Sequence, residues 1–473
     1  MKATYRKNIF RVRRWHCIVI GLIIIFVLIG CSSESTTPQK KQDSPLSIEE
    51  SHPETEKDSE GESPDARQII EDCLSEYDDP DEFLSFQTPA GLWGARAADF
   101  NDDNWPDVML WRGQFQTGDS FEIDFLLNDG IGKLRLGTTE ILTGPISSVV
   151  EGREVLIEDF NGDGRPDLFF ADQGMDSEPW PGSQNILVLS AHDGKMKDAT
   201  SNLPQQSDQT HSVAAADIEN DGDIDLFIGN LGGGGVSPQM LINDGSGKFN
   251  IDNDVLPREH VDLMRNWYTS SLFADINNDG YADLILGQAE TNKESHVLIN
   301  DGTGNFLNAK ASLPQSFFAP NQTVLDIQAE DINGDDFVDL ILSETRSSYV
   351  GRYIQVLINN GDETFTDETQ IRLPQSDNKK PWIIWINLVD LNLDNYIDII
   401  ASPMGDKEPL FFLNNGDGNF QPQENVFNIE VDNLFTYLDV DQDGLMDFFW
   451  SYPSCDDGSC PETHFIVKAI GCK

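Results

Sequence analysis

Short apolar runs and polar turns alternate along the chain from about residue 81 onward. In one unit, the run SLFAD (271–275) enters an acidic turn, DLILG (283–287) leaves it, and HVLIN (296–300) precedes an Asn-Asp-Gly turn and a fourth short run. Runs of this length predict β-strands, because Asn, Asp and Gly tolerate the backbone of tight hairpins. Each unit is therefore predicted to be a four-stranded antiparallel sheet.

The acidic turn recurs seven times, with starts 49 to 60 residues apart. The copies are DFNDDNWPD (99–107), DFNGDGRPD (159–167), DIENDGDID (217–225), DINNDGYAD (275–283), DINGDDFVD (331–339), DLNLDNYID (390–398) and DVDQDGLMD (439–447). Most are followed by a turn such as LINDGTGNF (298–306). Four strands in a repeat of about 55 residues are typical of a propeller blade. We expect an all-β fold, a seven-bladed propeller over residues 81–473.

The closure of this ring is also predicted by the sequence. The last unit ends before a fourth strand, whereas DEFLSFQTP (81–89), which lies before the first acidic turn, resembles the fourth-strand segment GNFLNAKASLP (304–314). The N-terminal segment is therefore expected to complete the seventh blade.

Residues 1–30 have the pattern of a signal peptide. Basic residues from Lys2 to Arg14 precede 14 apolar residues (17–30), a length that suits a signal better than a membrane-spanning helix. The run ends in Leu-Ile-Gly-Cys31, which resembles the bacterial lipobox. We expect export and a lipid anchor on Cys31 in the bacterial cell envelope, with the outer membrane or cell surface favoured. An uncleaved transmembrane anchor is the alternative.

Residues 31–64 are rich in Ser, Pro and Glu and are expected to form a flexible stalk. Residues 65–80 carry apolar positions at helical spacing and predict a short amphipathic helix. The remaining cysteines allow three pairings. Cys455 with Cys460 and Cys73 with Cys472 is the favoured pairing, and free thiols are the alternative.

The chain is strongly acidic, with 82 Asp and Glu against 31 Lys and Arg and a formal net charge of −51. Nucleic acid is therefore excluded as a partner by long-range repulsion, and cations are favoured. Apolar residues still make up 38% of the chain, enough for a large core. A monomer is expected.

The acidic turns have the chemistry of a calcium site. In the second copy, Asp159, Asn161, Asp163 and Asp167 offer hard oxygen ligands, and Gly164 permits a sharp bend. An EF-hand would need a glutamate at position twelve, where this copy has Phe170. Without a cation, the clustered carboxylates would repel one another.

The pattern D-x-[DN]-x-D-G-x-x-D with the later NDGxGxF resembles the FG-GAP repeats of integrin α-subunits and the related VCBS repeats of bacterial exported proteins. The resemblance spans about residues 81–473 and implies a seven-bladed propeller with up to seven structural Ca²⁺ ions, each between the first and second strand of a blade. The implied ligands are Asp99, Asn101, Asp103, Asp107, Asp159, Asn161, Asp163, Asp167, Asp217, Glu219, Asp221, Asp225, Asp275, Asn277, Asp279, Asp283, Asp331, Asn333, Asp335, Asp339, Asp390, Asn392, Asp394, Asp398, Asp439, Asp441, Asp443 and Asp447.

Some copies depart from this pattern. Asn104, Asp336 and Asn395 replace the glycine, although Asn and Asp also adopt the left-handed conformation. Glu219 is one methylene longer than the usual ligand, which puts the third site in doubt. Acidic turns without metal are the alternative.

In a four-stranded meander the acidic loops and the tight turns share one face, and the more variable connections share the other. Aromatic and basic residues near the starts of the innermost strands predict a surface for a protein or a glycan on that second face. These residues are Arg96, Arg153, His211, Arg265, Trp267, Tyr268, Trp382 and Trp385, together with Trp93. Packing between blades is the alternative role for the aromatic ones.

Catalysis has little support in the sequence, which contains no HExxH, P-loop or GxSxG motif. The function expected is that of an anchored, calcium-binding adhesion or scaffold module for a protein or a glycan. A polysaccharide lyase or glycoside hydrolase on the same fold is the alternative.

Overall fold

A computed structural model describes residues 86–88, 92–113, 118–231, 235–261, 266–289, 294–375, 378–392, 394–403, 410–423, 433–444, 446–452 and 462–467. All of them belong to one compact unit, Ser63–Lys473. The predicted signal peptide, stalk and amphipathic helix lie outside the described residues, as do Cys31, Cys73, Cys455, Cys460, Cys472 and Arg265. No helix within the described part of the chain is long and apolar enough to span a membrane.

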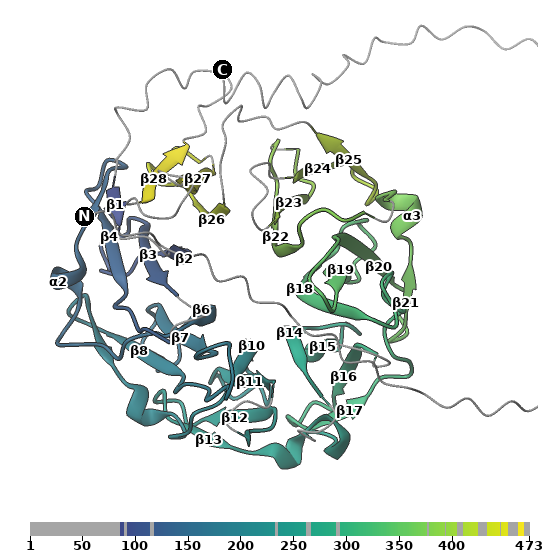
Figure 1. The fold of residues 1–473 in the computed structure, drawn as a ribbon, viewed down its shortest axis with the longest axis horizontal. Helices are drawn as coiled ribbons and strands as arrows, with labels where there is room; N and C mark the ends of the chain where they lie inside the picture. The colour runs from purple at the N-terminus through teal and green to yellow at the C-terminus, as the bar shows by residue number, and fades with distance from the viewer. Residues whose placement is uncertain are drawn as a thin grey trace, which may run out of the picture. The chain divides into compact units, whose positions relative to one another are not determined.

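The described strands form seven four-stranded antiparallel sheets, which are the blades of a propeller (Figure 1). Blade 1 contains β2 (Leu92–Ala98), β3 (Asp107–Arg112), β4 (Asp124–Asn128) and β5 (Leu134–Leu136); blade 2 contains β6 (Gly152–Glu158), β7 (Asp167–Asp172), β8 (Ile186–Ala191) and β9 (Lys195–Asp198); blade 3 contains β10 (Thr210–Ala216), β11 (Asp225–Asn230), β12 (Gln239–Asn243) and β13 (Phe249–Ile251); blade 4 contains β14 (Tyr268–Ala274), β15 (Asp283–Gln288), β16 (His296–Asn300) and β17 (Phe306–Asn308).

Blade 5 contains β18 (Gln322–Glu330), β19 (Asp339–Arg346), β20 (Tyr353–Asn359) and β21 (Phe365–Asp367); blade 6 contains β22 (Ile383–Val389), β23 (Asp398–Pro403), β24 (Leu410–Asn414) and β25 (Phe420–Gln423); blade 7 contains β26 (Asn433–Leu438), β27 (Asp447–Tyr452), β28 (Glu462–Val467) and β1 (Phe86–Thr88). The short helical turns between them are α2 (Thr138–Ile141), α3 (Thr369–Arg372), η2 (Thr200–Asn202), η4 (Asn253–Val255) and η5 (Arg258–His260). The first-listed strand of each blade lies nearest the centre of the ring (Figure 1).

The N-terminal strand closes the ring, as the sequence predicts. Phe86 pairs with His464 and Thr88 with Glu462, so β1 is the outermost strand of a blade whose other three strands come from the C-terminus. The first and last parts of the propeller are therefore held in one sheet by main-chain hydrogen bonds, which removes the two free edges that an open ring would have.

The core lies between blades, and the alternation of side chains explains how each blade packs on two neighbours. Leu284 and Leu286 of β15 pack in a cluster with Phe227 of blade 3, whereas Ile285 packs with Leu340 of blade 5. Successive side chains of a strand point to opposite faces, so a continuous apolar run such as DLILG serves two interfaces. The second strand of a blade is buried on both sides for this reason.

Each innermost strand carries a register shift near its start, for example between Gly152 and Glu154 in β6 and between Ile383 and Trp385 in β22. Such a bulge bends the strand and redirects the side chain of the extra residue. The shift occurs in all seven blades. The bulge is thus a repeated backbone feature that presents non-repeated side chains, Arg153 and His211 among them.

Candidate functional site

The acidic loop of blade 4 shows how the repeated nonapeptide is built. One oxygen of Asp275 accepts a hydrogen bond from the amide of Asp279 (3.1 Å), and the other accepts from Gly280 (2.8 Å). Asp283 at position nine accepts from the amide of Ile276 (3.0 Å). The first and ninth carboxylates therefore fold the loop around its own main chain, and the side-chain oxygens of Asn277 and Asp279 also accept from main-chain amides of the loop (3.0 Å each).

The three acidic loops that lack the glycine at position six adopt the same backbone turn as the loops that have it. Asn104, Asp336 and Asn395 have φ values of 69°, 69° and 66°, in the left-handed region that Gly164 also occupies. The expectation that Asn and Asp can replace the glycine at this position is confirmed. The cost of the left-handed conformation is small for these residue types because their short polar side chains bond locally.

The ninth aspartate is buried in every loop: Asp107, Asp167, Asp225, Asp283, Asp339, Asp398 and Asp447 are each at most 1% exposed. Burial, together with a smaller effect of the nearby carboxylates of Asp279 and Asp275, raises the pKa of Asp283 to about 7. Burial is also the main cause that raises the pKa values of five other ninth aspartates to between about 6 and about 8. These are Asp107, Asp167, Asp225, Asp339 and Asp398. A cation among these carboxylates would offset both effects.

The fit of a divalent ion can be judged in blade 7. One carboxylate oxygen from each of Asp439, Asp441 and Asp447 lies within 4.8 Å of the others. Two oxygens on opposite sides of a Ca²⁺ ion are separated by about twice the ~2.4 Å ligand distance, so a single ion can contact all three. The carboxylate donor set also suits Ca²⁺, which prefers hard oxygen ligands.

Blade 3 contains the loop that the sequence put in doubt. Glu219 lies beside Asp225 and contributes to raising the pKa of Asp225 to about 8, after the larger effect of burial. One carboxylate oxygen of Glu219 is buried and has no hydrogen-bond partner. Two facing carboxyl groups with an unpaired buried oxygen are compatible with a bound cation, so the longer side chain does not remove this loop from the candidate sites.

Two other loops hold their third residue differently. Asn161 and Asn333 donate from their amide nitrogens to Asp167 (3.1 Å) and Asp339 (3.1 Å). An amide nitrogen is not a metal ligand, so each amide group would have to rotate to bring its oxygen toward an ion.

In blades 1, 3, 4, 5 and 6 an asparagine in the tight turn links the blade to the preceding one, and this role was not predicted from the sequence. The Asn300 amide nitrogen donates to the carbonyl of Ile218 in blade 3 (2.8 Å), while its main-chain amide donates to Asp283 (2.8 Å). The same inter-blade bond is made by Asn128, Asn243, Asn359 and Asn414. The recurrence of Asn in the [LF][LI]N[DN]G turns was the available signal.

Blade 2 has Ser190 at the position of this asparagine. Its hydroxyl donates to Asp167 of its own blade (2.8 Å). At this seam Arg165 instead forms an ion pair with Asp102 of blade 1, which joins the two acidic loops directly. The bonds of these asparagines also show that acidic loops and tight turns share one face, as expected. We call it the loop face.

Three of the predicted partner-binding residues meet at the central channel. Arg153 of blade 2 lies over the ring of Trp385 of blade 6, with its guanidinium carbon 5.1 Å from the ring centroid, and Arg96 lies 5.4 Å from the centroid of Trp111. A cavity of about 390 Å³ adjoins them, with Glu154 and Asp326 among its lining residues. Burial raises the pKa of Glu154 to about 7 and that of Asp326 to about 6.

The same channel residues connect adjacent innermost strands. Glu154 accepts from the amide of Val213 in blade 3 (3.1 Å), and Asp326 accepts from the amide of Ile386 in blade 6 (2.7 Å). Part of this charge cluster therefore serves to hold the blades together.

Three of the predicted contact residues are buried, which corrects the expectation for them, and one of them is Arg153, which is 5% exposed beneath its contact with Trp385. Tyr268 is fully buried and its hydroxyl bonds to His260 (2.6 Å), and His211 is 6% exposed with a ring nitrogen 3.1 Å from the Thr269 carbonyl. The packing alternative holds for Tyr268 and His211, because protein groups already bond to the hydroxyl of the first and the ring of the second. Trp267 is only half-buried, and contact of the others with a partner stays a prediction.

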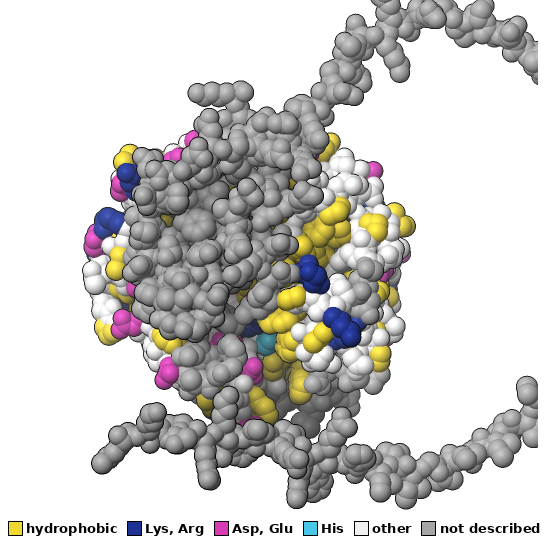
Figure 2. All heavy atoms as spheres, turned by 45° about the horizontal axis from the view of Figure 1, so that its top comes forward, with side chains coloured by type: hydrophobic (Ala, Val, Ile, Leu, Met, Phe, Trp, Pro, Cys, Tyr) yellow, Lys and Arg dark blue, Asp and Glu magenta, His cyan; other side chains and the backbone are white. Residues whose placement is uncertain are grey.

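The face opposite the loop face, which we call the variable face, carries an aromatic patch on blade 5 and on the connections that precede and follow this blade. The patch consists of Phe317, Phe318, Tyr349, Tyr353 and Trp382. Phe317 and Tyr349 are 41% and 43% exposed. Figure 2 shows hydrophobic side chains close to Lys or Arg side chains on the side of the ring where Figure 1 places β18–β21. The guanidinium of Arg346 lies over Phe318 at 4.4 Å.

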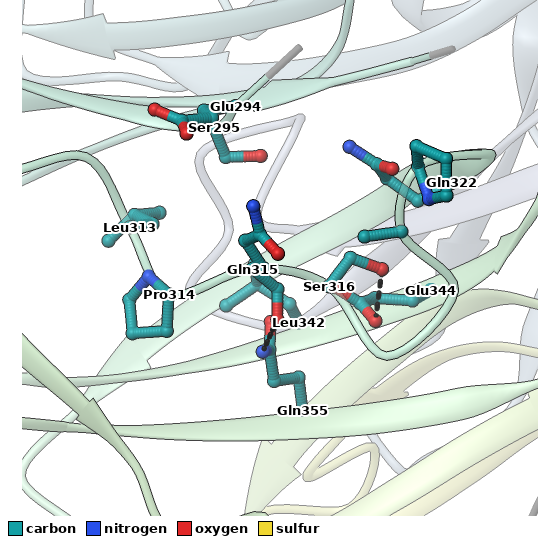
Figure 3. Close-up of a pocket in the computed structure, with 12 residues that line it drawn as sticks. Glu294, Ser295, Leu313, Pro314, Gln315, Ser316, Gln322, Leu342, Glu344 and Gln355 are labelled. Atoms are coloured by element: carbon teal, nitrogen blue, oxygen red, sulfur yellow. Dashed lines mark hydrogen bonds between the residues drawn. The ribbon is translucent and has the colours of Figure 1, made fainter. Parts of the chain in front are cut away.

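Beside this patch lies a pocket of about 310 Å³ between blades 4 and 5 (Figure 3). It lies on the variable face, between the connections that precede β16 and β18. No pattern in the sequence indicates this pocket, since its polar residues are scattered over four segments.

Four overlapping stretches of the chain, residues 159–228, 220–286, 275–342 and 331–401, match the sequence model of the FG-GAP-like repeat. Cartilage acidic protein 1 of Mus musculus is 28% identical over 155 residues, which are 30% of this chain and 21% of that protein. The same protein of Xenopus tropicalis is 24% identical over 163 residues, 32% of this chain and 22% of its own length. The chain thus spans about a fifth of these curated relatives.

Among solved structures, an Agrocybe aegerita lectin described as recognising non-reducing terminal N-acetylglucosamine matches with a TM-score of 0.48 and 17% identity. The match covers 82% of this chain and 87% of the lectin chain.

Proposed function

The chain belongs to the FG-GAP-like repeat family, and from this premise we propose that it is an exported, lipid-anchored binding module. Its acidic loops hold Ca²⁺ ions that stabilise the ring. Its variable face contacts a protein or a glycan of the surroundings.

The observation that carries the calcium proposal is the cluster of Asp439, Asp441 and Asp447, whose carboxylate oxygens lie within 4.8 Å of one another. The first, third, fifth and ninth side chains of each nonapeptide would hold the ion. When bound, Ca²⁺ supplies positive charge that balances these carboxylates. The chain's own contribution is to fix the oxygens in place through the main-chain bonds of the first and ninth aspartates, as Asp275 and Asp283 illustrate.

The proposed division of labour between faces is supported by how their residues are used. On the loop face, the same side chains and bonds recur from blade to blade. On the variable face, exposed aromatic side chains such as Phe317 and Tyr349 lie beside the guanidinium of Arg346. Aromatic and arginine side chains are enriched where proteins bind partners, because they bury a large area and carry polar groups as well.

The anchoring proposal rests on the N-terminal sequence. Two or more acyl chains at Cys31 would keep the protein on a membrane, and the Ser-, Pro- and Glu-rich stretch after it would act as a spacer. Mass spectrometry of the mature N-terminal peptide tests this: an acylated Cys31 is expected, and an unmodified N-terminus with an intact residue 1–30 segment would contradict it.

Calcium binding is tested by equilibrium dialysis of the purified propeller against increasing Ca²⁺. We expect saturable binding of several ions, up to seven. The double variant Asp439→Ala/Asp441→Ala should bind one ion fewer, whereas Asp301→Ala, an exposed residue of a tight turn, should bind as many as the wild type. Absence of saturable binding would refute this part of the proposal.

Partner binding is tested by incubating the calcium-loaded protein with envelope preparations and purified cell-surface glycans. Retention of the wild type and loss of retention by Trp382→Ala with Tyr349→Ala are expected, because these rings are in contact on the variable face (5.3 Å between centroids). Retention unchanged by the double variant would place the contact elsewhere.

A further inference from the structure

The pocket between blades 4 and 5 contains a buried carboxylate with one oxygen that no protein group satisfies. Glu344 of β19 is 1% exposed. One of its oxygens accepts from the Ser316 hydroxyl (2.8 Å) and from the Phe317 amide (3.2 Å), whereas Oε1 has no hydrogen-bond partner. A buried unpaired oxygen costs free energy in the absence of a ligand, so its presence in a pocket wall points to a ligand that forms a hydrogen bond with it.

The other polar groups of the pocket are amides. Figure 3 shows the Gln315 side chain projecting into the space between Ser295, Gln322 and the Ser316–Glu344 pair. Gln355 donates to the main-chain carbonyl of Gln315 (3.1 Å) and thereby fixes this part of the wall. Amide groups offer a donor and an acceptor side by side, as hydroxyl-rich ligands require.

The lining also limits the charge of a ligand. None of the described residues that line the pocket is Lys, Arg or His, and Glu294 and Glu344 are acidic. Anionic ligands such as phosphates or uronic acids would therefore find no cationic group to pair with. Burial raises the pKa of Glu344 to about 8, with a smaller contribution from Asp367, so the carboxyl is largely protonated at neutral pH and does not demand a cationic ligand.

The walls supply apolar surface as well. Leu313, Pro314, Pro320 and Leu342 contribute aliphatic groups, and the volume of about 310 Å³ is at the small end of ligand pockets, which span about 300–1,000 Å³. Just outside, the ring of Phe317 is held flat against Tyr353, with 4.2 Å between centroids and 10° between planes. An exposed, rigid aromatic face of this kind suits the apolar face of a second ring.

From this geometry we infer that the pocket binds one residue of a neutral saccharide, with Glu344 and Gln315 bonding its hydroxyl groups and Phe317 contacting the next sugar. This inference rests on the proposed function as a binding module and makes one of its two partner classes specific. It assigns the contact to a single inter-blade pocket and not to the channel residues Arg153 and Trp385.

The test uses the calcium-loaded propeller and isothermal titration with a panel of methyl glycosides: neutral hexoses, N-acetylhexosamines, a uronic acid and, as a cationic probe, choline. We expect saturable binding of at least one neutral glycoside and none of the uronic acid or choline. Glu344→Leu should abolish binding, and Gln315→Ala should weaken it roughly tenfold, the effect of losing one good hydrogen bond. Gln421→Ala, on the outer strand of blade 6, is the matched control and should bind as the wild type does.

The variants are chosen so that the result is interpretable. Gln315 is exposed and its main-chain carbonyl remains available to Gln355, so Gln315→Ala reports on binding even if Glu344→Leu does not fold. Neutral-sugar binding that is unchanged in Gln315→Ala, or preference for choline or the uronic acid, would overturn the inference. A wild type that binds no glycoside but is retained by envelope preparations would overturn the pocket assignment and leave the proposed function standing. A wild type that shows neither glycoside binding nor retention would overturn the pocket assignment and the proposed partner binding together.

Discussion

The loop face and the variable face differ in how much of their structure is repeated. On the loop face, Asp283 and Asn300 have equivalents in other blades that make the same hydrogen bonds. On the variable face, the connection between β7 and β8 runs over residues 173–185, whereas that between β15 and β16 runs over residues 289–295. The aromatic patch and the Glu344 pocket each occur in one place.

This difference indicates where stability and recognition are encoded. Groups that repeat around the ring make bonds within and between blades, so changing one of them should lower the free energy of unfolding. Groups that occur once on the variable face make few such bonds, so changing them should alter binding more than folding. The following predictions test this contrast in order of decreasing effect on stability.

The largest effect is expected for Asp283→Ala. Asp283 is fully buried and accepts from the amides of Asn300 and Ile276, so the substitution leaves two buried N–H groups without an acceptor. Each such group costs about 1–3 kcal/mol, which predicts a loss of about 2–6 kcal/mol. Urea denaturation in calcium-containing buffer measures it. Asp301→Ala, directly after Asn300 in the exposed turn, is the control and should change the free energy by less than about 1 kcal/mol.

Glu344→Gln should change the pH dependence of stability. Burial raises the pKa of Glu344 to about 8, above the value expected for an unfolded chain, so the folded state binds this proton more tightly. The resulting stabilisation is complete below the unfolded pKa and is lost as the pH rises through the folded pKa. The variant minus wild-type free energy of unfolding should therefore rise by on the order of 3 kcal/mol from roughly pH 5 to pH 8.

The control for this pH series is Glu294→Gln, on the same pocket but exposed. Its difference from the wild type should stay nearly constant over the same range. A flat difference for Glu344→Gln as well would show that the carboxyl is not held in its protonated form by burial.

Asn300→Ala should cost about 2 kcal/mol. The substitution removes the bond to the Ile218 carbonyl (2.8 Å) and the acceptor for Gly302 (3.0 Å), in a side chain that is 1% exposed. Thermal unfolding compared with Asn305→Ala, an exposed asparagine of the same turn, isolates this effect. Equal stability of the two variants would mean that the inter-blade bond contributes little.

Tyr349→Ala should change stability least and binding most. The ring is 43% exposed, so we expect a stability change of less than about 1 kcal/mol and weaker retention by the partner. Leu307→Ala removes a side chain that is 60% exposed on the outermost strand of blade 4, and it should leave retention unchanged. Equal loss of retention in both variants would show a non-specific hydrophobic effect.

The fold could be predicted from the sequence to a large extent because the repeat provides independent copies of one signal. Seven acidic turns predict seven blades. The segment at residues 81–89, which resembles a fourth strand and precedes the first acidic turn, predicts that β1 completes the last blade. The burial of the second strand of each blade on both of its faces also follows from its continuous apolar run, as in Leu284–Leu286.

The candidate site could be predicted only where it repeats. Asn300 was recognised as a turn former, but its bond to Ile218 depends on the angle between adjacent blades, which no local pattern specifies. Tyr268 stands at the start of an innermost strand, and its burial depends on packing against Phe227 of the neighbouring blade and on its bond to His260. The Glu344 pocket joins segments from two blades, so it exists only once blades 4 and 5 pack against each other.

The account's central claim is that the loop face stabilises the ring by binding calcium. Thermal unfolding of the wild type in Ca²⁺ and in excess EGTA tests this most directly. At free Ca²⁺ of about ten times the Kd, each occupied site adds roughly 1.4 kcal/mol, or about 10 kcal/mol for seven sites. The account predicts a large fall in melting temperature in EGTA that added Ca²⁺ reverses, and superimposable melting curves in the two buffers would contradict it.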